Sequence, residues 1–281
     1  MNRALTKWTP AAALILTALG LSQTLPPWAA MWLIAFALYF GAKWVTACAW
    51  FGRTTNARMF AYLLLWPGMD AVKFFNPAPV ARPLRNETTA PIVKILCGCA
   101  LLGIASHLQD QPTLRGWTAM IGLILILHFG LFHLLSIYWR NRGVNALPIM
   151  AKPMGSTSLT ELWGVRWNAA FTTLMQRTFM RPLARCVGTN GAFLGIFLIS
   201  GGIHELVITV PARGGYGWPT AYFALQGLGA LFERTVAGRA LGLGHGAIGW
   251  LFVFLIAGAP AYFLFPRAFI HNVILPMIQH L

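Results

Sequence analysis

The sequence has few charged residues of any kind, and acidic residues are the scarcest of them. Of the 281 residues only 10% are charged and only six are Asp or Glu, whereas 57% are hydrophobic. Soluble domains carry about 25% charged residues, so too few polar side chains are present here to cover a surface that faces water. This shortage excludes an ordinary soluble protein and predicts an integral membrane protein.

Metal-binding patterns and repeats are also lacking. The four cysteines have spacings that match no zinc or haem motif. His128 and His133 lie in one apolar run, and on a helix their side chains would point about 140° apart, so they do not form a metal pair. The sequence contains no internal repeat or low-complexity segment. We therefore expect no metal, no cofactor and no disulfide bond.

What the sequence has instead is a series of long, continuous apolar runs. Several approach the roughly 20 residues that a membrane-spanning helix needs, and only helices or closed barrels satisfy the backbone in lipid. We predict an all-α integral membrane protein, a multi-pass bundle of about seven to eight spans with interfacial amphipathic helices. One domain is expected over residues 1–281. The expected spans include residues 10–21, 28–50, 92–107, 117–139, 192–210, 218–232 and 247–265.

The net charge of +15 comes from 21 Lys and Arg residues against six acids. In a soluble protein such a balance would suggest nucleic acid. With the N-terminus inside, however, most of these cations fall in inside loops, as the positive-inside rule requires. We predict a cytoplasmic N-terminus, membrane lipids rather than nucleic acid as partners, and the inner membrane if the cell is bacterial. A signal peptide is the alternative for the N-terminus, because Arg3 and Lys7 precede a short apolar segment.

The segment 158–182 predicts an amphipathic helix at the membrane surface. It opens with Ser158-Leu-Thr-Glu161, a capping-box pattern. Its apolar arc would run from Trp163 to Phe179, and Pro182 would end the regular part. Asn168 falls inside this arc, where a buried amide needs hydrogen-bond partners. The partner is either the helix bundle or a substrate.

The opposite face of this helix is basic. Lipid headgroups are the default partner of such a face. The phosphates of a ligand are the alternative, because Arg can bind phosphate through two parallel hydrogen bonds. The residues concerned are Arg166, Arg177, Arg181 and Arg185.

An ionisable pair, His204 and Glu205, lies inside the apolar run that precedes Pro211. Ionisable residues within a membrane are costly and indicate function. Adjacent helical residues point about 100° apart, so we expect His204 to face a cavity and Glu205 to bond to the scaffold or to hold a partner. A buried imidazole stays neutral and can act as a general base toward an alcohol hydroxyl.

Two motifs resemble those of a known enzyme family. Leu162-Trp-Gly-Val-Arg-Trp-Asn168 resembles the Phe-Trp-Gly-Arg-Arg-Trp-Asn motif of wax synthases, and Arg181-Pro182 follows as in that group. His204-Glu-Leu-Val-Ile-Thr-Val-Pro211 resembles the His-Glu-x-x-x-Ser-Val-Pro stretch that carries the family's catalytic histidine. The chain therefore resembles a wax synthase-like member of the membrane-bound O-acyltransferase superfamily, with a motif-bearing core at about residues 158–233.

This resemblance implies transfer of a fatty acyl group from acyl-CoA, as co-substrate, to the hydroxyl of a long-chain or other lipophilic alcohol, which gives an ester. It implies His204 as the general base and Asn168 as the residue that orients the reacting groups. The supporting residues would be Glu205, Trp167 and Gln226. The residues that bind the acyl-CoA phosphates would be Arg166, Arg177 and Arg181.

Two other interpretations remain open. A proton-coupled transporter would use His204, Glu205 and Glu233 as a proton or ion path, although the inverted repeats typical of transporters are lacking. The second interpretation is a non-catalytic protein that has the same fold. Gln226, in the expected span 218–232, is a candidate cavity residue, with interhelical hydrogen bonding as its alternative role.

Overall fold

The computed structural model of the chain describes residues 3–76 and 79–279, and these residues form helices and no strand. This confirms the all-α prediction. Among the described residues, five helices are long and apolar enough, by length and composition, to cross a membrane. They are Pro27–Trp50, Thr89–Ser106, Pro112–Asn141, Ala169–Ala212 and Gly246–Leu264. All five overlap expected spans and support an integral membrane helical protein, while the total of about seven to eight spans stays a prediction.

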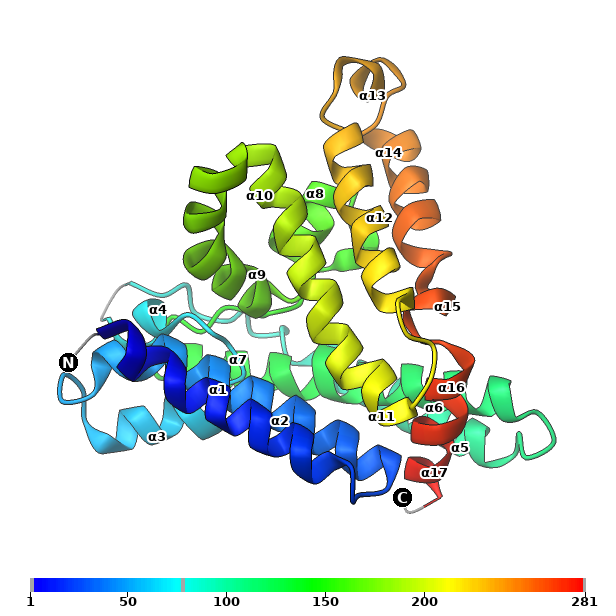
Figure 1. Ribbon diagram of the computed structural model, residues 1–281, viewed down its shortest axis with the longest axis horizontal. Coiled ribbons are helices and arrows are strands. Elements are labelled where there is room, and N and C mark those ends of the chain that lie inside the picture. The colour runs from blue at the N-terminus through cyan, green and yellow to red at the C-terminus, as the bar shows by residue number, and fades with distance from the viewer. Residues whose placement is uncertain (1–2, 77–78, 280–281) are drawn as a thin grey trace. The chain divides into compact units, whose positions relative to one another are not determined.

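The chain divides into two compact units, Met1–Ile149 with Ile270–Leu281, and Met150–Phe269. The single domain expected over residues 1–281 stays a prediction. The helices of the first unit (Figure 1) are α1 (Arg3–Ser22), α2 (Pro27–Ala47), η1 (Cys48–Trp50), α3 (Asn56–Leu64), α4 (Ala71–Phe75), α5 (Thr89–Ser106), α6 (Pro112–Ile124), η2 (Leu125–Leu131), α7 (Phe132–Asn141), η8 (Ile270–Ile274) and α17 (Leu275–Ile278).

In the first unit, α1 lies along α2 (Figure 1), and a buried lysine of α2 holds the short helix α3 against α2. Lys43 on α2 is fully buried, and its Nζ donates hydrogen bonds to the carbonyl oxygens of Tyr62 at 2.8 Å and Gly68 at 2.5 Å. The ammonium also lies over the Tyr62 ring, 3.8 Å from its centroid, a favourable cation–π position. Asp70 accepts a hydrogen bond from the Lys73 backbone and caps α4.

The second unit holds the segment that carries both sequence motifs. Within it, α10 packs along α12, and α12 contacts η7 and α15. Its helices (Figure 1) are η3 (Pro153–Gly155), α8 (Leu159–Glu161), η4 (Leu162–Arg166), α9 (Ala169–Met175), η5 (Gln176–Met180), α10 (Arg181–His204), η6 (Glu205–Thr209), α11 (Val210–Ala212), α12 (Trp218–Phe232), α13 (Val236–Ala240), α14 (Gly246–Val253), η7 (Phe254–Gly258), α15 (Ala261–Leu264) and α16 (Arg267–Phe269).

The amphipathic helix expected over residues 158–182 is not continuous, which corrects two predictions. Trp167 is extended and Asn168 is left-handed, with φ 46°, so the helix ends at Arg166 and a new one starts at Ala169. Asn is one of the few residues that adopt this conformation readily. Pro182 does not end the helix either, because it lies in the first turn of α10, where proline is tolerated. The chain bends instead at Gly188, whose φ is 72°.

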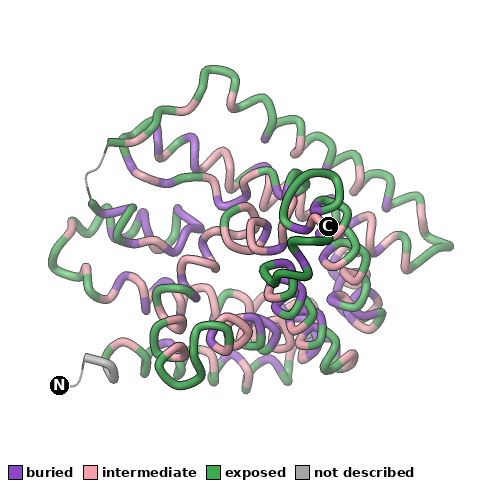
Figure 2. Tube along the Cα trace, turned by 90° about the horizontal axis from the view of Figure 1, so that it is seen from above, coloured by how far each residue is buried: buried purple, intermediate pink, exposed green. Residues whose placement is uncertain are grey.

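Many large apolar side chains of both units are exposed. Figure 2 shows exposed residues along much of the helical tube. They include Leu16, Leu96, Leu198 and Phe254. Exposed apolar side chains in such number are unusual in a soluble monomer and agree with an integral membrane protein.

Candidate functional site

His204 is the last residue of α10, and the wider turns of the π-helix η6 follow it directly. Its Nδ1 lies 2.7 Å from the carbonyl oxygen of Ser200, one turn earlier in the same helix. Because a carbonyl oxygen can only accept, Nδ1 carries the hydrogen and donates it. In a neutral imidazole the lone pair is then on Nε2, so the ring is oriented as a base at that atom.

An aromatic cluster holds the His204 ring. The Phe223 ring on α12 lies 4.4 Å from it, centroid to centroid. Phe223 in turn contacts Trp163 of η4 at 5.6 Å. The Trp163 indole donates a hydrogen bond to Gln226 Oε1 at 3.2 Å, and the amide of Gln226 donates to the Ile256 carbonyl at 2.6 Å. The fully buried Gln226 therefore links three helical segments through its hydrogen bonds. Interhelical hydrogen bonding was the alternative role predicted for this residue.

The carboxylate of Glu205 is directed away from the imidazole and caps α12. Its Oε1 accepts hydrogen bonds from the backbone N–H groups of Gly217 at 3.0 Å and Thr220 at 3.1 Å, and from the Thr220 hydroxyl at 3.0 Å. Its Oε2 accepts from the Thr209 hydroxyl at 2.6 Å. The N-cap of α12 is a glycine without a side chain, so Glu205 supplies the acceptor that the first turn lacks.

Asn168 is the N-cap of α9. Its Oδ1 accepts from the Phe171 backbone N–H at 3.3 Å, and its own N–H contacts the sulfur of Met150 at 3.3 Å. These contacts are local, and among the described residues no hydrogen bond or ring contact joins Asn168 to His204. The half-buried amide keeps its Nδ2–H groups as further donors.

Two carboxylates fix the start of α8, which runs directly into η4. The buried carboxylate of Glu233 accepts from the backbone N–H groups of Leu159 at 2.7 Å and Thr160 at 2.8 Å. Glu161 accepts from the Thr157 N–H at 2.9 Å. That hydrogen bond, followed by its bonds with Arg166, lowers the pKa of Glu161 against the opposing effect of burial.

The predicted supporting and phosphate-binding residues have different surroundings. Trp167 packs its ring against Trp163 at 6.3 Å. The Arg166 guanidinium bonds Glu161 at 2.6 Å and the Lys152 carbonyl at 3.1 Å, so its hydrogen-bonding groups are already engaged. Arg177 in η5 and Arg181 at the start of α10 are exposed.

Sequence reasoning did not find Phe223, Ser200 or Thr220 as parts of the site. Phe223 is 4% exposed and reads as an ordinary core residue of an apolar helix. Ser200 acts through its carbonyl, which no sequence pattern reveals. Thr220 lies two residues into α12, where a threonine indicates a helix start and does not indicate the carboxylate that it binds.

Residues 146–225 match the model of the membrane bound O-acyl transferase family. The matched segment includes Asn168, His204 and Glu205, and Gln226 follows it immediately.

Three similar proteins are plant acyltransferases. A long-chain-alcohol O-fatty-acyltransferase of Simmondsia chinensis is 29% identical over 103 residues, 34% of this chain and 29% of that protein. A probable long-chain-alcohol O-fatty-acyltransferase 1 of Arabidopsis thaliana is 29% identical over 140 residues, 46% of this chain and 41% of that protein. Acyl-CoA–sterol O-acyltransferase 1 of Arabidopsis thaliana is 32% identical over 85 residues, 28% of this chain and 25% of that protein. The chain spans less than half the length of these relatives.

Proposed function

We propose, from its membership of the membrane-bound O-acyltransferase superfamily, that this chain transfers a fatty acyl group from acyl-CoA to the hydroxyl of a long-chain or other lipophilic alcohol. The relatives carry names of acyltransferases that act on long-chain alcohols and on sterols. The product is an ester, and free CoA is released. The reaction requires a base for the alcohol and no further cofactor.

The observation that carries the proposal is the orientation of the His204 imidazole. With Nδ1–H donated to Ser200, Nε2 is free to take the proton from the alcohol as its oxygen attacks the thioester carbonyl. The tetrahedral intermediate then expels the CoA sulfur. The proton on Nε2 passes to that sulfur, so the imidazole is neutral again at the end of the cycle.

Asn168 and the exposed arginines have complementary roles in this proposal. The Nδ2–H groups of Asn168 donate to the thioester oxygen, where negative charge develops. Arg177 and Arg181 bind phosphates of CoA, because both lie exposed beside the start of α10. Arg166 instead holds η4 through Glu161.

The transporter interpretation is disfavoured by the hydrogen bonds of the two carboxylates. Glu205 accepts from the first turn of α12 and Glu233 accepts from the first turn of α8. Each carboxylate therefore caps the start of a helix, a structural role that a proton path does not require.

The first prediction concerns His204. In membranes that contain the protein, labelled long-chain acyl-CoA and a panel of alcohols, we expect ester formation, and we expect His204→Gln to lower its rate about 100-fold or more. Gln can still donate a hydrogen bond but is not a base. Radiolabelled ester separated by thin-layer chromatography measures the rate.

His107→Gln is the matched control, because His107 is an exposed histidine outside the second unit. This variant should form ester at the rate of the unaltered protein. Ester formation that survives His204→Gln would contradict the role of the imidazole. Absence of ester from the unaltered protein with every alcohol and sterol would contradict the function itself.

A further inference from the structure

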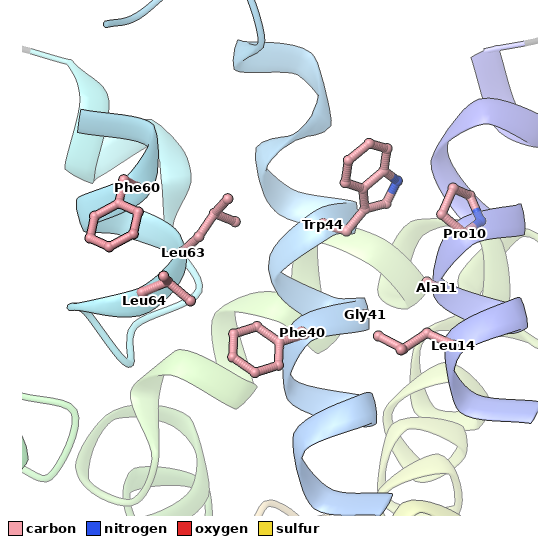
Figure 3. A pocket seen from close by; sticks show the side chains of 9 residues that line it. All are labelled: Pro10, Ala11, Leu14, Phe40, Gly41, Trp44, Phe60, Leu63 and Leu64. Atoms are coloured by element: carbon pink, nitrogen blue, oxygen red, sulfur yellow. The ribbon is translucent and has the colours of Figure 1, made fainter. Parts of the chain in front are cut away.

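An apolar groove of about 410 Å³ lies in the first unit between α1, α2 and α3. Figure 3 shows the side chains of α2 between those of α1 and α3, with Phe40 on the side of Leu64 and Trp44 on the side of Pro10. Leu14, Phe60 and Leu64 at its rim are 42%, 56% and 51% exposed. The groove is therefore open to the surroundings, and its apolar lining suits a hydrocarbon chain.

Small residues form the floor of the groove. A Cβ atom on Gly41 of α2 would contact the Cβ atom of Ala11 on α1 at 3.4 Å. Two such residues let membrane helices approach closely. The larger side chains of Leu14, Phe40 and Trp44 then stand on either side of this contact, which leaves a recess between them.

Lys7 lies on α1 one helical turn before the groove-lining residues Pro10 and Ala11. Trp44, which lines the groove, donates a hydrogen bond from its indole to the Thr6 carbonyl at 3.4 Å. Lys7 is the next residue, and Lys7, Ala11 and Leu14 recur at helical spacing on one face of α1. Lys7 therefore lies on the groove-lining face of α1, one turn before the first residues that line the groove.

Arg53 lies at the same end. The rings of Trp44 and Phe51 are 5.2 Å apart, and the exposed Arg53 follows Phe51 after one residue. In Figure 1 the start of α1 and the turn after α2 lie at the same end of this unit. Aromatic residues beside Lys and Arg are typical of the membrane interface.

No carboxylate of these helices faces the two cations. The sequence has no Asp or Glu before Asp70, and Asp70 is engaged as the cap of α4 with Lys73 beside it. The end of the groove thus presents positive charge that no carboxylate of α1, α2 or α3 neutralises. An apolar groove with cations at one end matches a lipid that has an anionic headgroup.

We propose that this groove binds an anionic glycerophospholipid. One acyl chain lies in the recess over Gly41 and Ala11, and the phosphate lies between Lys7 and Arg53. The proposal is independent of acyl transfer, because it concerns a lipid that is bound and not converted.

The test uses purified full-length protein in detergent, with phosphatidylglycerol or phosphatidylcholine of identical acyl chains as probes. Native mass spectrometry measures the affinity for each lipid. We expect preference for phosphatidylglycerol, and the double variant Lys7→Gln, Arg53→Gln should lower its affinity about 10- to 30-fold. Leu14→Trp should lower the affinity for both lipids, because the indole fills the recess.

Two control variants match these changes. Leu16→Trp adds an indole on α1 at a residue that is 68% exposed and does not line the groove. Arg239→Gln removes an exposed arginine from α13. Both should bind phosphatidylglycerol as the unaltered protein does. Equal affinity of the unaltered protein for the two lipids would overturn the proposal, and so would equal effects of the charge variant and Arg239→Gln. The charge variant keeps the test valid if Leu14→Trp fails to fold.

Discussion

His204 and Glu205 are neighbours in the sequence, but they have separate surroundings. Nδ1 of His204 bonds within its own helix, whereas the carboxylate of Glu205 reaches Gly217 and Thr220 at the start of α12. The first N–H groups of a helix lack partners within the helix and carry partial positive charge. The carboxylate of Glu205 accepts hydrogen bonds from these N–H groups and also places a negative charge beside them. It thereby fixes α12, the helix that carries Phe223.

The second prediction follows at this scale. Glu205→Gln should lower the free energy of unfolding by about 1–3 kcal/mol. The new amide nitrogen cannot accept the hydrogen bond from Thr209, and the negative charge at the start of α12 is lost. Thermal unfolding in detergent measures the change. Asp110→Asn, at an exposed carboxylate, is the control, and a midpoint for Glu205→Gln equal to that of this control would refute the capping role.

Among the elements, the contact between α10 and α12 decides where His204 meets Phe223. A Cβ atom on Gly201 would lie 2.7 Å from the Thr220 Cα atom, too close for any side chain without movement of the helices. The next residue, Gly202, has nothing within 4 Å of the equivalent position. The two adjacent glycines therefore differ in the space around them, and only Gly201 limits the distance between α10 and α12.

The third prediction compares these glycines. Gly201→Ala should lower the free energy of unfolding by about 1–3 kcal/mol, because it forces α10 and α12 apart. Gly202→Ala should leave it unchanged or raise it by up to about 1 kcal/mol, since alanine favours a helix. Unfolding midpoints and ester formation, measured in parallel, should both fall for the first variant alone. Equal effects of the two substitutions would show that the close contact is unimportant.

For the molecule as a whole, a partly buried ion-pair cluster in the first unit links stability to pH. Glu87, just before α5, accepts hydrogen bonds from Arg140 and, at 3.1 Å, from His133 of α7. Burial opposes ionisation of Glu87, but the bonds with Arg140, His133 and the Leu84 backbone prevail and lower its pKa from 4.5 to about 2. The folded state therefore binds this proton less readily than the unfolded state does.

The fourth prediction gives the sign of this dependence. A lowered pKa adds stability that is present above the ordinary value and is lost as the pH falls toward the folded value. The unaltered protein should lose about 2 kcal/mol through Glu87 between about pH 5 and pH 3. Glu87→Gln should remove that part of the loss, as measured by unfolding midpoints across this range. An acid-side slope that is the same in Glu87→Gln and in the unaltered protein would rule the linkage out.

By itself, the sequence determined the helical class, the apolar segments and the residues that carry the motifs. Apolar runs report directly which segments avoid water, so the expected span 218–232 has the bounds of α12. The capping box at Ser158 was also predictable, because a cap depends on residues a few positions apart, and Ser158 accepts from the Glu161 N–H at 2.9 Å. The roles of His204 and Asn168 stay predictions.

Only the tertiary structure decided what lies around these residues. The helix expected through Asn168 breaks at this residue, although the local sequence permits both a continuous helix and a left-handed cap. The contact of Trp163 with Phe223 joins residues that are far apart in the sequence. The groups that donate hydrogen bonds to Glu205 lie up to fifteen residues away, and the groove over Gly41 depends on the approach of two helices. Distances between segments arise from packing, and periodicity within one segment carries no information about them.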